Sequence, residues 1–257
     1  MPTPSRIICL TEETVEAIYL MGEQDRIVGV SGFVVRPPEA RRKPKVSTFL
    51  EAKIEEILAL NPDLVFTFSD IQADITANLM RAGLQVHAFN HRTVEGIFDM
   101  IRTVGALIGE VEKAAVVSEE LRRKVDRVRE MSKLISKRPR VYFEEWDEPM
   151  ISSIGWVSEL IEIAGGENVF ADRAFNQSAM DRVVTVPEII TAQPDIIIGS
   201  WCGKKFKSEL VTARSGMAAV PAVRNGRLHE IKSAIILQPG PAALTDGLHS
   251  LHSIIRG

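Results

Sequence analysis

The sequence predicts an α/β fold of two Rossmann-like lobes, each with a mostly parallel sheet, joined by a long bridging helix. Three observations support this prediction. Short β-rich runs alternate with amphipathic segments, which is typical of parallel sheets covered by helices. One sequence element occurs twice, once in each half of the chain. A helical stretch without strand signals separates the two copies.

The first lobe is predicted to span residues 1–108. Gly22 and Gly83 end two of its helices, because glycine commonly follows the last helical residue. The expected strands are 6–10, 27–30, 64–68 and 85–89, and the expected helices are 13–21, 50–60, 72–82 and 94–108. Strands that are connected through helices are predicted to pair in parallel.

The repeated element reads EILALNPDLVF at 56–66 and EIITAQPDIII at 188–198. Its proline ends a helix, and the apolar run after it begins a strand. Asp63 and Asp195 are therefore interpreted as structural residues, with a catalytic role as the alternative. The repeat predicts a second lobe at 138–257 that is similar to the first, with a cleft between the two.

A bridging segment is predicted at 109–137, with one continuous helix over about 111–136 that ends at Arg138-Pro139. A helix of about 25 residues is roughly 38 Å long, which is enough to reach from one lobe to the other. The alternative is a surface helix within a single large domain. The repeat on either side of the segment favours the bridging interpretation.

Composition narrows the function classes. A net charge of −3 gives no bulk attraction for nucleic acid, and two cysteines cannot build a disulfide framework. No apolar run approaches the roughly 18 residues of a membrane span, so the chain is not expected to be membrane-inserted. We expect a monomer. The N-terminus lacks a secretory apolar stretch, which predicts a cytoplasmic protein unless a leader was removed, in which case it is periplasmic or extracellular.

Several stretches resemble one known family. They are LTEE at 10–13, VEAIYLMG at 15–22, DRIVGVS at 25–31, PKVSTF at 44–49, IGWVSELIEIAGGENVF at 154–170 and SGM at 215–217. Together they resemble the substrate-binding proteins of ABC importers that have a helical backbone, and most of all the cobalamin-binding branch. The resemblance implies capture of cobalamin or a related corrinoid between two lobes. A ferric siderophore and haem are the nearest alternative ligands.

Candidate ligand-binding residues follow from the expected sheets. Ligands of open parallel sheets bind beyond the carboxyl ends of the strands, where this sequence is rich in aromatic residues. Large flat side chains suit a macrocycle or another planar chelate, although each of them could instead pack in a core. The candidates are Thr11, Glu12, Phe33, Phe49, Phe68, His91, Trp146, Trp156 and Trp201. Two basic clusters could hold an anionic group of the ligand if both flank the cleft, or could simply be solvated. They are Arg36, Arg41, Arg42, Lys43 and Lys45 in the first lobe, and Lys204, Lys205 and Lys207 in the second.

The resemblance also implies a partner, the permease of an ABC transporter. Binding proteins of this family dock through acidic side chains on each lobe. Asp74 and Glu188 are the candidates, one in each lobe. The alternative is that both residues only stabilise helix N-termini.

An enzyme is not predicted, because the GxSxG, P-loop and GxGxxG signatures are missing. No catalytic residue, catalytic cofactor or metal site is therefore expected. Two alternatives from other classes stay open, a cytoplasmic corrinoid carrier and a carboxylate-based enzyme. The enzyme would set Glu12 and Glu13 against Glu144, Glu145 and Asp147 as acid and base.

Overall fold

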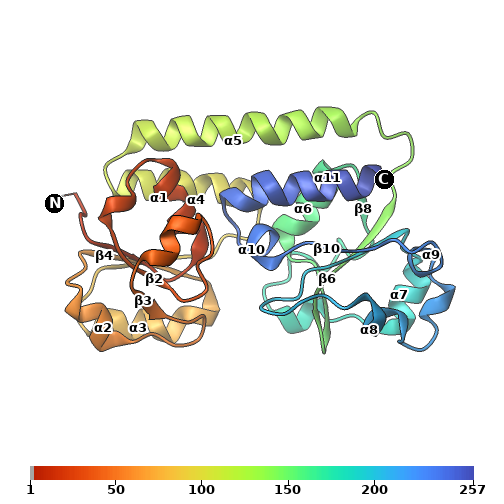
Figure 1. Cartoon of the computed structure of the whole chain (residues 1–257), viewed down its shortest axis with the longest axis horizontal. Helices are drawn as coiled ribbons and strands as arrows, with labels where there is room; N and C mark the ends of the chain where they lie inside the picture. Colours follow the sequence, from red (N-terminus) through yellow and green to blue (C-terminus); the bar gives the residue numbers. More distant parts are fainter. Residues whose placement is uncertain (1–2) are drawn as a thin grey trace. The chain divides into compact units, whose positions relative to one another are not determined.

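The computed structural model describes residues 3–257, which form two compact α/β units (Figure 1). Unit 1 contains the described residues up to His91 together with Glu95–Leu121, and unit 2 contains Arg92–Val94 and Arg122–Gly257. Each unit has its own mostly parallel sheet, which confirms the predicted fold class. No helix within 3–257 is both long and apolar enough to span a membrane.

The sheet of unit 1 has the order β3-β2-β1-β4-β5, and all of its strands run parallel. Its strands are β1 (Ile7–Cys9), β2 (Ile27–Ser31), β3 (Lys45–Ser47), β4 (Leu64–Phe68) and β5 (Val86–Phe89). In the centre, Ile7 pairs with Leu64 and Cys9 with Phe66. Strand β3 was not predicted, because this short edge strand gives little apolar signal.

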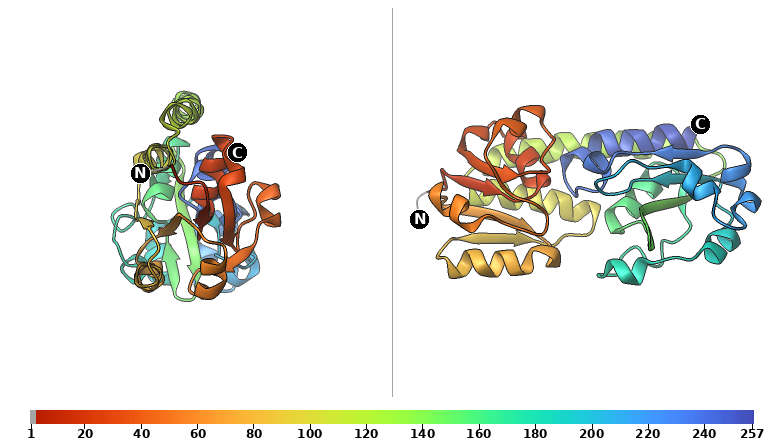
Figure 2. Two further views of the ribbon diagram at one scale, coloured as in Figure 1. Left: turned by 90° about the vertical axis from the view of Figure 1, so that its left-hand side faces the viewer. Right: turned by 60° about the horizontal axis from the view of Figure 1, so that its bottom comes forward.

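Helices cover both faces of this sheet (Figures 1 and 2). They are α1 (Glu12–Leu20), α2 (Ile54–Ala59), α3 (Ala73–Arg81) and α4 (Val94–Leu107), which begins in unit 2. Ile57 of α2 and Leu79 of α3 pack with Ile8 and Val65 of the sheet in one core cluster. Helix α1 lies on the opposite face of the sheet (Figure 1).

Helix α2 is shorter than its predicted range of 50–60. The amide of Thr48 donates to the carbonyl of Glu51 at 2.7 Å, and the amide of Lys53 donates to the carbonyl of Val46 at 2.9 Å. These two bonds hold the chain before Ile54 in a turn against β3. The turn delays the start of the helix.

The sheet of unit 2 has the order β10-β9-β6-β7, with β8 also paired to β6. Its strands are β6 (Arg140–Asp147), β7 (Met150–Ser152), β8 (Glu167–Asn168), β9 (Ile196–Gly199) and β10 (Leu228–Glu230). Strands β8, β9 and β10 pair in parallel, whereas β7 returns antiparallel to β6 in a hairpin. The apolar runs of β6 and β9 are buried, as expected of central strands.

Unit 2 also contains several helices. They are α6 (Gly155–Ile163), α7 (Val186–Ala192), α8 (Ser208–Thr212), α9 (Pro221–Arg224), α10 (Ser233–Ile236) and α11 (Leu248–Arg256). The predicted long helix is α5 (Val111–Ser132), whose first half belongs to unit 1 and whose second half belongs to unit 2.

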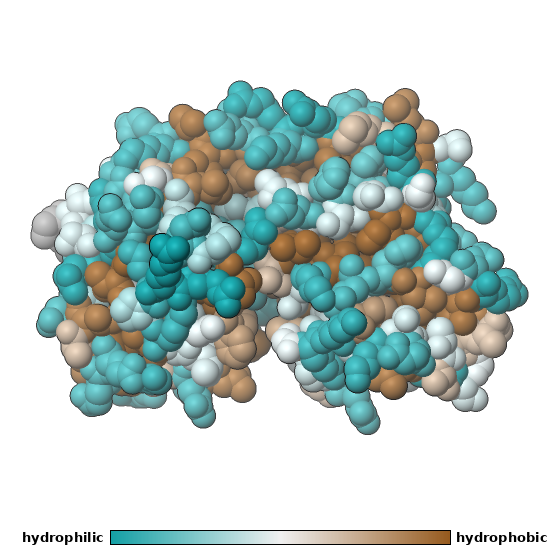
Figure 3. All heavy atoms as spheres, in the orientation of Figure 1, coloured by the Kyte–Doolittle hydropathy of each residue, from teal (hydrophilic) through white to brown (hydrophobic). Residues whose placement is uncertain are grey.

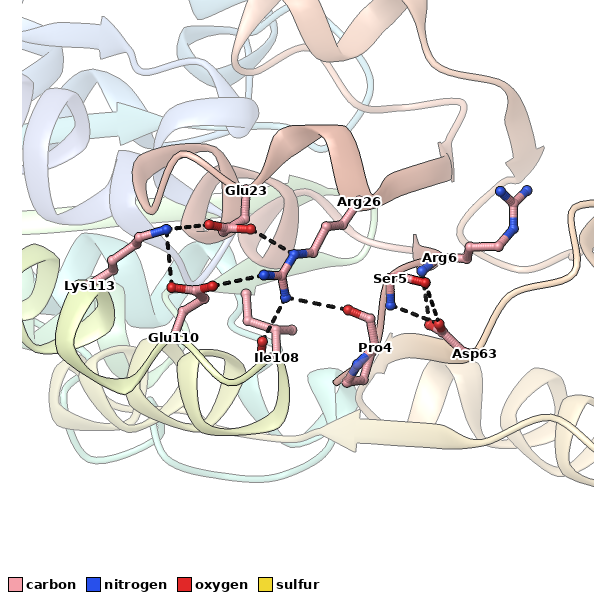
Figure 4. Close-up of polar contacts among 9 residues, drawn as sticks. All are labelled: Pro4, Ser5, Arg6, Glu23, Arg26, Asp63, Ile108, Glu110 and Lys113. Atoms are coloured by element: carbon pink, nitrogen blue, oxygen red, sulfur yellow. Dashed lines mark hydrogen bonds and ion pairs between the residues drawn. The ribbon is translucent and has the colours of Figure 1, made fainter. Parts of the chain in front are cut away.

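The repeated Pro-Asp element has the same structural role in both units. Asp63 accepts a hydrogen bond from the amide of Arg6 at 3.0 Å, just before β1 (Figure 4). Asp195 accepts one from the amide of Arg140 at 2.9 Å, at the first residue of β6. Each aspartate thus fixes the beginning of the strand that pairs with its own.

A cluster of charges fastens the turn between α4 and α5 to the rest of unit 1 (Figure 4). The guanidinium of Arg26 contacts Glu23 at 2.6 Å and Glu110 at 2.8 Å, and it donates to the carbonyl of Ile108 at 2.7 Å. Lys113 forms ion pairs with both glutamates. The start of α5 is therefore held by side chains as well as by its backbone.

Candidate functional site

The carboxyl ends of the five parallel strands of unit 1 meet at one edge of the sheet, which we call the unit 1 edge. The structure brings six of the predicted residues to this edge. They follow or end the five strands in turn, namely Thr11 and Glu12, Phe33, Phe49, Phe68 and His91. The topology that follows from the β-α-β order therefore gathers these side chains.

The aromatic side chains of the unit 1 edge form two pairs. The rings of Phe33 and Phe49 have centroids 5.4 Å apart, and those of Phe68 and His91 have centroids 5.2 Å apart. Phe33 is 48% exposed, and the other three are half-buried. Aromatic surface is thus available to a ligand here rather than being consumed in the core.

Gln72 connects three of the loops at this edge. Its buried side-chain carbonyl accepts from the amide of Phe68 at 3.1 Å, and its amide group donates to the carbonyls of Leu10 at 3.4 Å and Phe49 at 3.3 Å. Sequence analysis missed this residue, because its partners are distant in the chain. Its only local signal is a glutamine four residues after the end of the buried strand β4.

Two acidic residues, Glu12 and Glu13, begin α1 at the unit 1 edge. Glu12 accepts from the amide of Val35 at 3.1 Å, and Glu13 accepts from the hydroxyl of Thr11. Burial raises the pKa of Glu12 to about 8 and that of Glu13 to about 7, because water no longer solvates the ionised forms. Within residues 3–257, the Oε2 atoms of both glutamates lack a hydrogen-bond partner.

The loop that presents Phe33 is held against α1. The bond from Val35 to Glu12 is one attachment, and an ion pair between Arg36 and Glu16, at 2.7 Å, is the second. Glu12 therefore positions an aromatic residue, and it is itself almost fully buried.

Unit 2 has a corresponding edge, the unit 2 edge, where β6 and β9 end. Trp146 lies at the end of β6, and Trp201 follows β9. The ammonium of Lys204 lies 4.0 Å from the ring centroid of Trp146 and 5.2 Å from that of Trp201, and it forms an ion pair with Asp147 at 2.5 Å. The lysine covers both indole rings through cation–π contacts.

The buried carboxylate of Glu144 fixes the indole of Trp201. Glu144 accepts from the indole of Trp201 at 2.9 Å and from the hydroxyl of Tyr142 at 2.8 Å, and Arg214 pairs with both of its oxygens at 2.5 and 2.9 Å. Burial raises the pKa of Tyr142. Sequence analysis did not find Tyr142 or Arg214 as members of this cluster.

The other unit 2 carboxylates that could have served as acid and base in an enzyme also form ion pairs within unit 2. Glu145 forms an ion pair with the buried guanidinium of Arg182 at 2.6 Å, and Asp147 contacts Lys204. Glu144 is bound by Arg214. Each of these three carboxylates is therefore occupied by a cation of unit 2.

Trp156 and Trp201 are both enclosed by protein. Trp156, at the start of α6, is 3% exposed, and its indole donates to the carbonyl of Ile236 at 2.8 Å. Trp201 is 2% exposed, but part of its cover is the exposed side chain of Lys204. Trp201 also packs in the core cluster of unit 2, where its ring centroid lies 5.0 Å from that of Phe206.

The two candidate docking residues differ in their surroundings. Asp74 is exposed in the first turn of α3. Glu188 is half-buried, closes a capping box with Thr185 and pairs with Arg173. These hydrogen bonds, that of Arg173 above all, lower the pKa of Glu188 to about 2.

Two cavities open near the unit 2 edge. One of about 280 Å³ is lined by Trp201, Gly203, Lys204, Lys205, Glu230, Ile231, Lys232 and Ser233. Another, of about 640 Å³, includes Asp147, Pro149, Leu210 and Arg214 in its wall. Across residues 3–257 no three His, Cys, Asp or Glu side chains gather in a way that could hold a metal ion.

Two α/β units that each gather aromatic side chains at the carboxyl ends of their strands define a solute-binding class of protein. The periplasmic binding protein family matches residues 7–235, and the chain belongs to that family. The family consists of solute-binding proteins rather than enzymes, so the carboxylate-based enzyme is excluded.

Curated relatives share sequence over most of the chain. A cobalamin-binding protein of Halobacterium salinarum is 27% identical over 93% of this chain and 66% of its own length. A vitamin B12-binding protein of Vibrio parahaemolyticus is 28% identical over 93% and 85%. An ABC transporter substrate-binding lipoprotein of Bacillus subtilis, YvrC, is 24% identical over 96% and 79%.

Solved structures share the fold. A Staphylococcus epidermidis protein, described as a possible iron-binding (periplasmic solute-binding) protein, has a TM-score of 0.86 at 23% identity and covers 100% of both chains. The haem-binding protein RhuT of Roseiflexus sp. RS-1 has a TM-score of 0.82 at 23% identity, covering 98% of this chain and 99% of its own.

Proposed function

We propose that this protein captures cobalamin or a related corrinoid and delivers it to an ABC importer. The observation that supports this function most strongly is the set of partly exposed aromatic side chains at the unit 1 edge, in a chain whose relatives include cobalamin-binding proteins. A corrin ring offers large apolar faces, which stack well on phenylalanine and tryptophan.

In this proposal the ligand contacts Phe33, Phe49 and Phe68 of the unit 1 edge and Trp146 of the unit 2 edge. His91 offers an imidazole beside Phe68. Thr11 and Glu12 act mainly by shaping the unit 1 edge, since both are buried.

A specific observation favours a second ligand class. Lys204, Lys205 and Lys232 line the cavity of about 280 Å³ at the unit 2 edge, and they outnumber the two carboxylates that pair with them, Asp147 with Lys204 and Glu230 with Lys232. Such a cavity suits an anionic substituent of a planar chelate. Haem has two carboxylates and many ferric siderophores are anionic, so these ligands are the alternatives to a corrinoid.

Calorimetric titration with cyanocobalamin, haem and a ferric hydroxamate distinguishes these ligands. The proposal expects saturable one-to-one binding that is tightest for cyanocobalamin and leaves the ligand chemically unchanged. Tighter binding of haem or the ferric chelate would show that this ligand, rather than a corrinoid, is the one that the protein captures. Absence of heat with all three would reject the function.

The permease of an ABC transporter is the proposed partner, in a periplasmic or extracellular compartment, and the protein acts as a monomer. Asp74 is the stronger docking candidate, because it is exposed. Glu188 must release Arg173 before it can pair with a permease cation. Charge reversal of Asp74 should abolish stimulation of the transporter ATPase and leave ligand affinity intact, whereas unchanged stimulation would discard it.

A further inference from the structure

A third cavity lies at the opposite end of the unit 2 strands from the aromatic residues. Its volume is about 630 Å³, and part of its wall is Pro139 and Arg227. These two residues directly precede β6 and β10, which run in the same direction. The cavity therefore lies at the amino ends of the strands, opposite the unit 2 edge.

The wall of this cavity combines cations with apolar side chains. It is formed by the end of α5, the following loop and α11, which lie side by side at this end of the unit (Figure 1). Its members are Met131, Leu134, Ile135, Ser136, Lys137, Pro139, Arg227, His252, Ile255 and Arg256. The wall contains no acidic side chain.

The cations of the wall differ in how firmly they are held. Arg227 is half-buried and donates to the carbonyl of Ile254 at 2.7 Å, which fixes its guanidinium in the wall. Lys137 and Arg256 are exposed. His252 is held by Ser132 at 3.2 Å. One cation that is fixed by a hydrogen bond and two exposed cations therefore border the same cavity.

The sequence around the cavity is strongly basic, although the whole chain has a net charge of −3. Between residues 122 and 140, nine Lys and Arg residues stand against two Asp and Glu residues. Four of these cations form ion pairs, namely Arg129 with Asp126, Lys133 with Glu130, Arg138 with Glu162 and Arg140 with Glu167. Hydrophilic side chains are interspersed with hydrophobic ones on the surface along α5 (Figure 3). Lys137 and Arg256, the exposed cations of the cavity wall, should each attract an anionic surface by about 1 kcal/mol.

The exposure of Leu134 favours a lipid over other anionic partners. This side chain is 87% exposed at the rim of the cavity, beside the half-buried Ile135. Nucleic acid would be recognised by the cations alone. A phospholipid uses both features, because its phosphate meets the cations while the exposed leucine enters the boundary between headgroups and acyl chains.

We propose that the cavity of Lys137, Arg227 and Arg256 binds the headgroup of an anionic phospholipid in a membrane surface, with Leu134 inserted beside it. The site is separate from the ligand edges. It would hold the protein against a bilayer by one end of unit 2 and leave the carboxyl ends of the strands free for the ligand.

Vesicle sedimentation of the full chain tests this site. Vesicles of phosphatidylcholine with phosphatidylglycerol should sediment the protein at low salt, whereas vesicles of phosphatidylcholine alone should not. The double variant Lys137→Ala/Arg256→Ala should partition about tenfold or more weakly into the anionic vesicles. Leu134→Ser, which keeps every charge, should also weaken the partition.

The matched control is Lys53→Ala/Arg81→Ala, which removes two exposed cations from unit 1. It should stay within about twofold of the wild type, and thermal melting verifies that each variant is folded. Equal sedimentation with both vesicle types, or equal loss in the control and the cavity variant, would overturn the proposal. It would also be overturned by a fluorescent oligonucleotide that binds through Lys137 and Arg256 while anionic vesicles do not.

Discussion

The ion pair with Arg214 compensates for the cost of burying the charged Glu144 side chain. Both carboxylate oxygens of Glu144 accept from its guanidinium, and the same carboxylate orients the indole of Trp201. The presentation of an aromatic ring at the unit 2 edge therefore depends on an ion pair below it.

Replacement of Arg214 by Met should destabilise the protein, because it leaves a buried carboxylate without its cation. We expect a loss of about 3–5 kcal/mol in the free energy of unfolding, measured by urea denaturation. The control Arg224→Met removes an exposed cation from α9 and should change that energy by less than about 0.5 kcal/mol. A similarly small loss for Arg214→Met would refute the role of the ion pair.

Glu12 should make stability depend on pH. Burial raises its pKa from 4.5 to about 8 in the folded state, so the folded protein holds a proton that the unfolded chain releases. This contribution to stability is complete below about pH 4.5 and is lost as the pH rises through about 8.

The variant Glu12→Gln tests this dependence, because glutamine keeps an acceptor for the amide of Val35 and cannot ionise. Its melting temperature should decrease less between pH 5.5 and 8.5 than that of the wild type. The matched substitution Glu55→Gln, on the half-exposed start of α2, should follow the wild type. Parallel melting curves for wild type and Glu12→Gln would contradict the buried, protonated carboxyl.

At the scale of elements, the sequence pattern predicted more of the fold than of the side-chain network. The repeat, the β-α-β order and the long α5 follow from local patterns, because apolar runs, prolines and glycines determine them. Gln72 and Arg214 were missed, since their partners lie 62 and 70 residues away. Trp156 was placed at the ligand, but its enclosure by Ile236 depends on packing that no local pattern indicates.

The two Pro-Asp elements should contribute to stability independently, since each holds one strand of a different unit. Asp63→Ala and Asp195→Ala should each cost about 1 kcal/mol through lost hydrogen bonds to Arg6 and Arg140. The double variant should cost the sum of the two. Chemical denaturation measures all three. Asp172→Ala, at an exposed position, is the control, and equal effects of all four variants would contradict a special role of the element.

At the scale of the whole molecule, each unit has its Pro-Asp contact and its aromatic residues at opposite ends of its strands. The amino ends hold the structural contacts of Asp63 and Asp195. The carboxyl ends gather the aromatic residues. The duplicated Pro-Asp element therefore gives both units the same arrangement. The aromatic residues at the carboxyl ends differ between the units, and these differences would determine ligand specificity.

The most direct test is equilibrium binding of cyanocobalamin to the wild type, Phe33→Ala, Trp146→Ala and Leu20→Ala. Leu20, which is exposed at the end of α1 away from the unit 1 edge, is the control for Phe33. The account predicts one-to-one binding that each aromatic variant weakens about tenfold or more, and that Leu20→Ala changes by less than about twofold. Equal affinity in all four proteins would contradict it.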